Sequence, residues 1–423
     1  MFKGGVNKKA ETIAVLDIGS SKVVCLIGQR VPNFGVKLIG SGFGVSAGLK
    51  NGAVVDMEAA EVGIRTAVEK AERAAGVTVQ SVCVNVALRS LRSQHMNVQT
   101  EFASGEVADR DLKRVLNSSL AELAQPEDAI LHAIPLNWSV DDENGIRDPR
   151  GMFGQRLGVE MHFVLAGVGP LRNLAHCIER CHLQISSVTV SPYAAGIGVL
   201  TDDERDLGVT IIDMGGGITT AAVFRDNTMV HVDALSVGGK NVTNDIARGL
   251  TTPSEAAERI KTIYGSALHG SDDSHVMVPC PPMGAQEELS HQPRDLLTSI
   301  IRSRVEETFE LLRDRIADSG LETYSGRRIV LTGGGSQLNG VRELAEYVFN
   351  KRVRIGRPHG ILGMREALSG PDFAVATGLL KHAFMESGEA ISGPPDLSGQ
   401  RYRKKRYTGN SLGRSLQWLK ENF

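Results

Sequence analysis

Short apolar runs alternate with glycine-rich turns and amphipathic stretches along most of the chain. In the second half, Val209–Arg225 predicts a strand, a tight turn and a second strand, with Asp213 at the end of the first apolar run. Near the N-terminus, Thr12–Leu16 runs into Asp17, and a second apolar run covers Lys22–Ile27. Helical periodicity follows each hairpin. This order of elements is typical of mixed α/β domains.

Glycine turns follow both aspartates. Glycine lets backbone N–H groups close on an anion, and a carboxylate at the end of a strand is suited to a hydrated cation that accompanies phosphate. A single glycine turn of this kind usually has no role in phosphate binding. However, Asp213 follows Asp17 by 196 residues, close to half of the 423-residue chain. We therefore expect two halves that face one phosphate. A third turn, Gly333–Gly335, stands between a strand and a helix, where it can cradle a phosphate or leave room for a flat ring.

The remaining pattern predicts further strands and helices. Asp56 and Gly76 have the residue types of a helix N-cap and C-cap. Further strands are expected over Val36–Val45, Val79–Ala87, Phe163–Gly167 (resuming the first sheet), Ile185–Val190, Thr228–Val237 and Arg328–Thr332. Helices are expected over residues 56–75, 109–123, 170–182, 192–200, 241–250, 294–318, 339–349 and 372–384.

Two stretches need separate interpretation. Residues 88–162 contain polar loops, one helix and two turn-rich segments, which indicates an inserted subdomain. The run Thr252-Pro253-Ser254-Glu255 predicts a capping box with proline at the first helical position. That helix carries Glu258 and Lys261 on one face, and a solvated ion pair is the simplest interpretation of their spacing.

Composition limits the classes of protein. The chain is long enough for two or more domains, and its 41% hydrophobic and 23% charged residues are ordinary for a globular protein. A net charge of −2 gives no indication of nucleic-acid binding. We see no secretory signal and no apolar run long enough to span a membrane. Five cysteines, mostly within apolar runs, fit a reducing compartment. His176, Cys177, Cys181 and His182 are better explained as parts of a packed helix than as metal ligands.

The C-terminal region has a different composition. Residues 387–400 have almost no core-forming side chains and predict a flexible linker, which with the basic segment extends to residue 407. Residues 408–423 predict a short amphipathic helix that lies in a membrane interface, helped by the basic residues. Docking on the protein itself, or nucleic-acid binding by the basic tail, are the alternatives. The residues expected at the membrane are Arg403, Lys404, Lys405, Arg406, Leu412, Leu416, Trp418, Leu419 and Phe423.

Taken together, the three glycine turns resemble those of the actin/Hsp70/sugar-kinase superfamily. Asp17–Lys22 matches its first phosphate motif, Asp213–Thr219 its second and Leu331–Gly335 its adenosine motif. Within that superfamily the chain resembles the FtsA family of bacterial cell-division proteins. This closer resemblance rests on the inserted VDDENGIRDPRGMFG segment, the GGKNVTNDIA stretch and the tethered C-terminal helix.

The resemblance implies a two-lobed actin-like fold of duplicated RNase H-like domains with an inserted subdomain. The expected division is first lobe 1–87 and 163–192, insertion 88–162, second-lobe core 193–230 and 305–386, smaller second-lobe subdomain 231–304, then linker and helix. ATP would lie between the lobes, with Mg²⁺ held through water by Asp17 and Asp213. The nucleotide site implied is Asp17, Gly19, Ser20, Ser21, Lys22, Asp213, Gly215, Gly216, Gly217, Thr219, Gly238, Asn241, Glu258, Lys261, Gly333, Gly334 and Gly335.

The family resemblance also implies a role and partners. Such proteins form actin-like filaments, bind the C-terminal peptide of the tubulin-like protein FtsZ, hold the division ring at the cytoplasmic face of the inner membrane, and recruit later divisome proteins to the septum. Arg294, Arg302 and Arg304 are candidates for contact with the acidic peptide. A small-molecule kinase or a pilus-assembly relative of the same fold is the alternative.

Two residues depart from the pattern of hydrolysing relatives. Ser191 stands where a water-orienting Gln or Glu is usual, and Ile218 where Thr is usual. Because positioning of the nucleophile is much of phosphoryl-transfer catalysis, we predict ATP binding with slow or absent hydrolysis.

Overall fold

The first lobe is built on a six-stranded sheet. In this computed structural model, residues 11–32, 35–123, 127–284, 288–321, 326–385, 389–391, 393–395 and 397 are described. The sheet has the order β11-β6-β1-β2-β3-β19. Its strands are β1 (Thr12–Ile18), β2 (Lys22–Val31), β3 (Gly35–Val45), β6 (Ser81–Val86), β11 (Gln184–Val190) and β19 (Ile361–Leu362). A small hairpin, β4 (Leu49–Lys50) and β5 (Ala53–Val54), follows β3.

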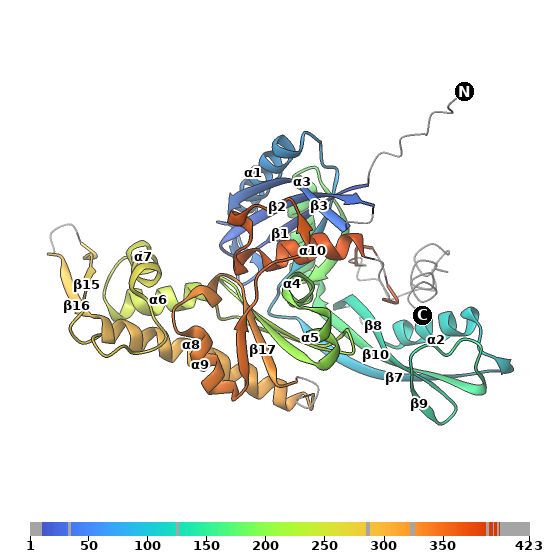
Figure 1. Cartoon of the computed structure of the whole chain (residues 1–423). Coiled ribbons are helices and arrows are strands. Elements are labelled where there is room, and N and C mark those ends of the chain that lie inside the picture. The colour runs from blue at the N-terminus through green and yellow to red at the C-terminus, as the bar shows by residue number, and fades with distance from the viewer. Residues whose placement is uncertain are drawn as a thin grey trace.

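Helix α1 (Met57–Ala75) covers one face of this sheet beside α3 (Val168–Arg180) (Figure 1). Asp56 Oδ1 accepts the Ala59 N–H at 3.0 Å, and Gly76 ends the helix in the left-handed region, as predicted. Glycines of β3 let α1 lie directly on the strand. A Cβ on Gly42 would stand 2.0 Å from the Ala67 carbonyl oxygen.

The second lobe repeats the arrangement with a five-stranded sheet of order β14-β13-β12-β17-β18. Its strands are β12 (Val209–Met214), β13 (Thr219–Arg225), β14 (Thr228–Leu235), β17 (Arg328–Thr332) and β18 (Arg352–Ile355). A second apolar core packs against one side of it. That core is formed with α6 (Gly239–Gly249), α7 (Ser254–Tyr264), α8 (Arg294–Asp318), α9 (Val341–Phe349) and the hairpin β15 (Met277–Cys280) and β16 (Ser290–Pro293).

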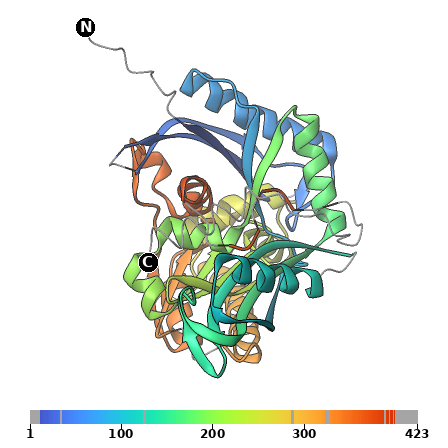
Figure 2. The ribbon, with the colours of Figure 1, turned by 90° about the vertical axis from the view of Figure 1, so that its right-hand side faces the viewer.

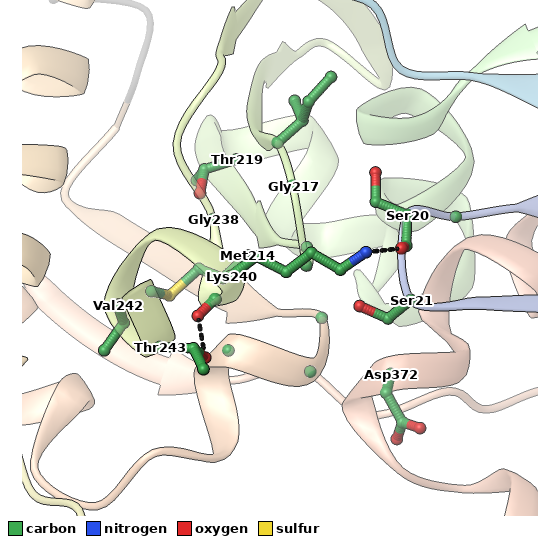
Figure 3. Close-up of a pocket in the computed structure, with 18 of the residues that line it drawn as sticks. Ser20, Ser21, Met214, Gly217, Thr219, Gly238, Lys240, Val242, Thr243 and Asp372 are labelled. Atoms are coloured by element: carbon green, nitrogen blue, oxygen red, sulfur yellow. Dashed lines mark hydrogen bonds between the residues drawn. The ribbon is translucent and has the colours of Figure 1, made fainter. Parts of the chain in front are cut away.

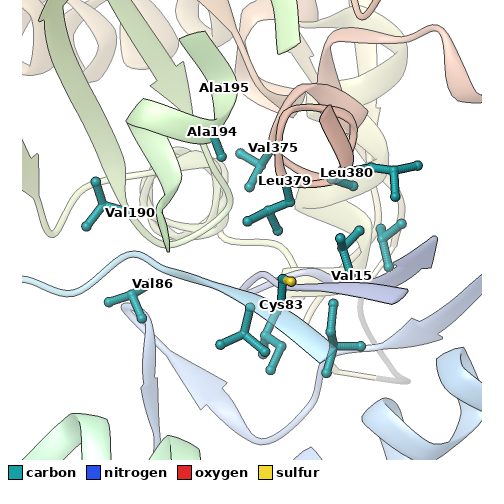
Figure 4. Packing of buried hydrophobic residues seen from close by; sticks show 14 of the residues in the cluster. Val15, Cys83, Val86, Val190, Ala194, Ala195, Val375, Leu379 and Leu380 are labelled. Carbon is teal, nitrogen blue, oxygen red and sulfur yellow. The ribbon is translucent and has the colours of Figure 1, made fainter. Parts of the chain in front are cut away.

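Two helices cross between the sheets and join the lobes. They are α4 (Ser191–Val199) and α10 (Ala374–Phe384), and both views place α10 between the blue strands and the second lobe (Figures 1 and 2). One continuous apolar cluster includes Val15, Ile211 and Leu379 and thus spans both sheets. Figure 4 shows Ala194, Val375 and Leu379 meeting above the first sheet. Short elements complete the lobes: α5 (Asp202–Leu207), η1 (Gly334–Gln337), η2 (Glu366–Leu368) and η3 (Pro371–Phe373).

The inserted subdomain is a four-stranded antiparallel sheet of order β7-β10-β8-β9 with one helix, α2 (Asp109–Leu123). Its strands are β7 (Arg92–Glu106), β8 (Asp128–Val140), β9 (Glu143–Ile146) and β10 (Phe153–Gly167). The helix bounds match the prediction. The prediction of loops around it was wrong. In β7, Val98 and Phe102 are buried while Asn97, Gln99 and Glu101 are exposed, and the many polar residues on the exposed face obscure the strand periodicity in the sequence.

The stretch Phe163–Gly167 was expected to resume the first sheet. It is instead the end of β10, which pairs with β7 and β8. Likewise, residues 305–386 were assigned to the second lobe, but β19 within them pairs with β3 and extends the first sheet.

The predicted capping box at Thr252 is also absent. The Thr252 hydroxyl donates to the Pro281 carbonyl at 2.7 Å, and Pro253 is the N-cap without a side-chain bond. A long-range acceptor thus competes successfully with the local cap.

Part of the predicted linker is docked on the body. Glu389 and Ala390 are buried. The Ala390 N–H donates to the Ala133 carbonyl at 2.8 Å, and Glu389 accepts from His132 Nδ1 at 2.9 Å. The basic segment and residues 408–423 lie outside the described residues. Within the described part of the chain, no helix is long and apolar enough to cross a membrane.

Candidate nucleotide-binding cleft

The first two glycine turns meet at one cleft of about 1240 Å³ between the lobes. Their backbones are so close that side chains would collide. A Cβ on Gly216 would lie 2.0 Å from Ser21 Oγ, and one on Gly217 would lie 2.7 Å from Ser20 Oγ. Figure 3 shows the two serines on the opposite side of the cleft from Gly217. A side chain at either glycine would displace a serine hydroxyl of the opposite turn, and the expectation of two facing halves is met geometrically.

The start of α6 is fixed to the second of these turns. The Gly239 N–H donates to the Gly215 carbonyl at 3.0 Å, and the Lys240 N–H donates to the Gly216 carbonyl at 2.8 Å. The Lys240 side chain then reaches across the cleft and donates to the Ser20 carbonyl at 2.5 Å (Figure 3). Lys240 was missed in the sequence, although a lysine directly after paired glycines at a helix start is a usable signal.

Asp17 and Asp213 are the buried carboxylates of the cleft, and each is 9% exposed. Burial raises the pKa of Asp17 to about 7, with Lys22 opposing the rise and Asp372 adding to it. Burial raises the pKa of Asp213 to about 7 as well, and the negative charge of Asp17 contributes. Two carboxylates that resist ionisation together are stabilised as anions by a cation placed between or beside them.

Lys22 is held within the protein. Its ammonium donates to Asp372 Oδ2 and lies 3.5 Å from the centroid of the Phe373 ring. Asp372 itself lines the cleft (Figure 3). It too was missed, because its partner is 350 residues away and no local pattern marks the pair.

Glu258 and Lys261 form part of the α7 wall. Lys261 Nζ donates to Glu258 Oε2 at 2.7 Å, to Thr243 Oγ1 at 2.9 Å and to the Gly239 carbonyl at 3.2 Å. Burial raises the pKa of Glu258, but hydrogen bonds from Lys261 and Thr243 outweigh it and the pKa is lowered. The pair is thus charged, lines the cleft and is tied to the start of α6. It is more than the solvated pair that spacing alone indicated.

The third glycine turn closes the remaining side. A Cβ on Gly333 would lie 2.3 Å from Asp213 Oδ1, whereas one on Gly334 would meet nothing nearer than 3.9 Å. Gly334 therefore leaves open space at the cleft wall, as the prediction of room for a flat ring requires.

The cleft brings together the residues predicted for the site, with one exception. Asn241 does not line it, and its side chain accepts the Gly238 N–H at 3.0 Å. Thr219 lines the cleft, but its hydroxyl donates to the Val237 carbonyl at 2.8 Å. Both polar groups support the backbone of the second turn and the start of α6.

Ser191 and Ile218, the two departures from hydrolysing relatives, also line the cleft. Ser191 is buried and its Oγ accepts from Asn85 Nδ2 at 3.0 Å, while Asn85 Oδ1 accepts the Ile18 N–H at 2.6 Å. The serine side chain is thus committed to the protein and is too short to reach far into the cleft.

The cleft fits a phosphate-bearing ligand with a cation. Buried Ser46 Oγ and Thr220 Oγ1 line it without a hydrogen-bond partner among the described residues. Such oxygens are costly unless a ligand or water satisfies them. In the described residues no group of three His, Cys, Asp or Glu side chains is placed to hold a metal ion directly.

The three arginines proposed for an acidic peptide are occupied within their own subdomain. Arg294 donates to the Tyr264 carbonyl at 3.1 Å, Arg302 to Glu306 at 3.3 Å, and Arg304 to Asp245 at 2.6 Å. These bonds reduce the charge available to a partner, and their role in peptide binding stays a prediction.

Comparison with solved structures defines the class. The chain is similar to a chain of the PilM–PilN type IV pilus biogenesis complex, with a TM-score of 0.63, 18% identity, and coverage of 88% of this chain and 98% of that one. It is also similar to MreB5 of Spiroplasma citri bound to ADP, with a TM-score of 0.52, 13% identity, and coverage of 87% and 94%. The fold is thus that of the actin-like two-lobed proteins, with the cleft between the lobes.

Sequence comparison gives the family. A model described as "Cell division protein FtsA" matches residues 210–378, and one described as "SHS2 domain inserted in FTSA" matches residues 89–165. Cell division protein FtsA of Rhizobium meliloti is 43% identical over 99% of this chain and 96% of its own length. That of Pseudomonas aeruginosa is 32% identical over 98% and 99%. The chain belongs to the FtsA family of cell-division proteins, and the inserted subdomain is its SHS2 domain.

Proposed function

We propose that this protein binds ATP with Mg²⁺ in the interlobe cleft, forms actin-like filaments and ties the FtsZ ring to the inner membrane at the septum. The observation that carries the nucleotide part is the meeting of two glycine turns, 196 residues apart in sequence, beside Asp17 and Asp213. Backbone N–H groups at such turns bind phosphate oxygens. The two carboxylates would hold the hydrated cation.

The cleft supports holding a nucleotide more than cleaving it. No residue with the reach of Gln or Glu stands at position 191, and the serine there is bound to Asn85. ATP then acts as a ligand that favours one arrangement of the lobes, and hydrolysis is slow or absent. Titration with ATP and Mg²⁺ tests binding, and phosphate release measured on the same samples tests turnover. Rapid release would contradict this part.

The membrane part rests on the amphipathic residues 408–423 and the basic residues before them. The full chain and a chain ending at Gln400 are compared by co-sedimentation with vesicles containing anionic lipid. Only the full chain is expected to pellet with the vesicles. Equal binding by both chains would exclude this helix as the anchor.

The FtsZ part is tested separately on the soluble body. The C-terminal peptide of FtsZ is expected to bind the chain ending at Gln400, and recruitment of later divisome proteins is proposed to use the inserted subdomain. Failure of the peptide to bind would remove the tethering proposal without affecting nucleotide binding.

A further inference from the structure

Lys240 is the second residue of α6, and its side chain is the one that bridges the two phosphate turns. Its backbone N–H is bonded to the Gly216 carbonyl of the second turn, and its ammonium to the Ser20 carbonyl of the first. Figure 3 shows the side chain extended between these points. The bond between the Lys240 N–H and the Gly216 carbonyl fixes the position of the Lys240 Cα beside the second turn. The ammonium, bonded to the first turn, therefore lies in the space between the two turns.

The charges of the cleft single this lysine out. Three lysines line it. Lys22 is paired with Asp372 and Lys261 with Glu258. Among the described residues, Lys240 has no carboxylate within ion-pair distance, and the partner of its ammonium is an uncharged backbone carbonyl. An ammonium gains more from a charged oxygen than from a neutral one, so Lys240 is the cleft cation that has most to gain from an anion.

We propose that Lys240 binds the polyphosphate of a nucleoside di- or triphosphate from the second-lobe side, exchanging the Ser20 carbonyl for a phosphate oxygen. The inference rests on the proposed nucleotide-binding function and adds a recognition residue to it. A ligand held by both turns lies within reach of this ammonium, because the ammonium already reaches one turn from the other. A single phosphate attached to the nucleoside need not extend to this point.

The test compares Lys240→Met, Lys240→Gln and Lys240→Arg in the full-length protein. Affinities for ATP, ADP and AMP are measured by calorimetry with Mg²⁺ at low and high salt. Lys240→Met is expected to weaken ATP binding roughly tenfold to a hundredfold at low salt, the usual size for a hydrogen bond to a charged group. The loss should shrink at high salt, because the lost interaction is between charges. Binding of AMP should change less than threefold or so.

Two comparisons separate charge from other effects. Lys240→Gln keeps a polar donor on a side chain one bond shorter but has no charge, so it should bind ATP as weakly as Lys240→Met, whereas Lys240→Arg should bind nearly as well as the wild type. Lys37→Met is the matched control, since Lys37 is exposed on β3 near the edge of the first sheet. It should leave all three affinities unchanged, and unchanged AMP binding reports that each variant is folded.

The outcomes are distinct. If the wild type binds none of the nucleotides, the proposed function itself fails. If the wild type binds ATP and the Met and Gln variants bind it equally well or more tightly, Lys240 is only a latch between the lobes and the inference is wrong. Equal weakening for ATP and AMP would also overturn it, because the effect would then not concern the polyphosphate.

Discussion

The crossing of α4 and α10 holds the lobes together through glycine, and Gly378→Ala tests it. A Cβ on Gly378 would lie 1.6 Å from the Ala194 carbonyl oxygen and 2.4 Å from the Ala194 carbonyl carbon. Ordinary contact begins near 3.4 Å, so the helices must separate by on the order of 1.5 to 2 Å. They cannot do so freely, because α10 is packed against both sheets. A Cβ on Gly198 of α4 would lie 2.4 Å from the Ala374 carbonyl oxygen of α10, so each helix uses a glycine to approach the backbone of the other.

The expected loss of stability follows from these contacts. Overpacking usually costs about 1–3 kcal/mol, and a clash with backbone belongs at the upper end. Alanine in a helix regains about 0.5–1 kcal/mol relative to glycine. The net loss of about 2 kcal/mol should lower Tm by roughly 2 °C in a protein of this size, because the shift per kcal/mol falls as the unfolding entropy grows with chain length. ATP affinity should fall as well, because the helices that move apart set the separation of the phosphate turns.

Thermal unfolding followed by circular dichroism measures the effect. Gly169→Ala is the matched control, because Gly169 lies in α3 and a Cβ there meets nothing within 4 Å. This control should leave Tm unchanged or slightly raised. A Gly378→Ala variant that melts within about 1 °C of the wild type would refute the argument that backbone contact at this crossing is essential.

Three further predictions concern the cleft and the docked C-terminal segment. Because burial raises the pKa of Asp213 from 3.8 to about 7, its contribution to ligand-free stability is fully present below about pH 4 and is lost as pH rises from there to about 7. Asp213→Asn should therefore flatten the fall in Tm between about pH 4 and pH 7, and parallel curves for variant and wild type would contradict this. Gly216→Ala should weaken ATP binding, since its Cβ would stand 2.0 Å from Ser21 Oγ and the hydroxyl must turn away into the cleft; unchanged affinity in calorimetry would show that the turns do not need this approach. Glu389→Gln should lower stability by about 1–3 kcal/mol, because it removes the buried charge that accepts from His132 Nδ1, and should speed proteolytic release of the C-terminal segment; equal cleavage rates would argue against docking.

The sequence predicted the parts of the fold that local chemistry controls. Helix α1 begins after the Asp56 N-cap and ends at Gly76, which has a left-handed backbone conformation. Helix α8 spans the predicted residues because its buried positions recur at helical spacing. The two turns of the cleft were recognisable as a pair because glycine and aspartate occur together at strand ends.

What could not be predicted depends on distant partners. Lys240 finds its acceptor 220 residues away, and Glu389 finds His132 at a separation of 257. The paired glycines before Lys240 mark it as a candidate for the site, but neither residue carries a local signal that names its partner. Strand β7 of the insertion was missed for a different reason: its outward-facing residues are so polar that the alternation resembles a loop.

The inserted subdomain is hydrogen-bonded to both lobes and to the chain beyond α10. On one side, the subdomain binds the edge strand β14 of the second lobe: Ser93 Oγ accepts the Val232 N–H at 2.8 Å, and His162 Nδ1 donates to the Met229 carbonyl at 2.9 Å. Burial holds the pKa of His162 well below its usual range, so this imidazole stays neutral.

On its other side, the same subdomain is joined to the first lobe and to the chain beyond α10. His132 Nε2 accepts the Val190 N–H at 3.0 Å, while its Nδ1 donates to Glu389. The inserted subdomain thus contacts both lobes away from the cleft. Glu389, beyond α10, is thereby bonded to the same subdomain that contacts both lobes.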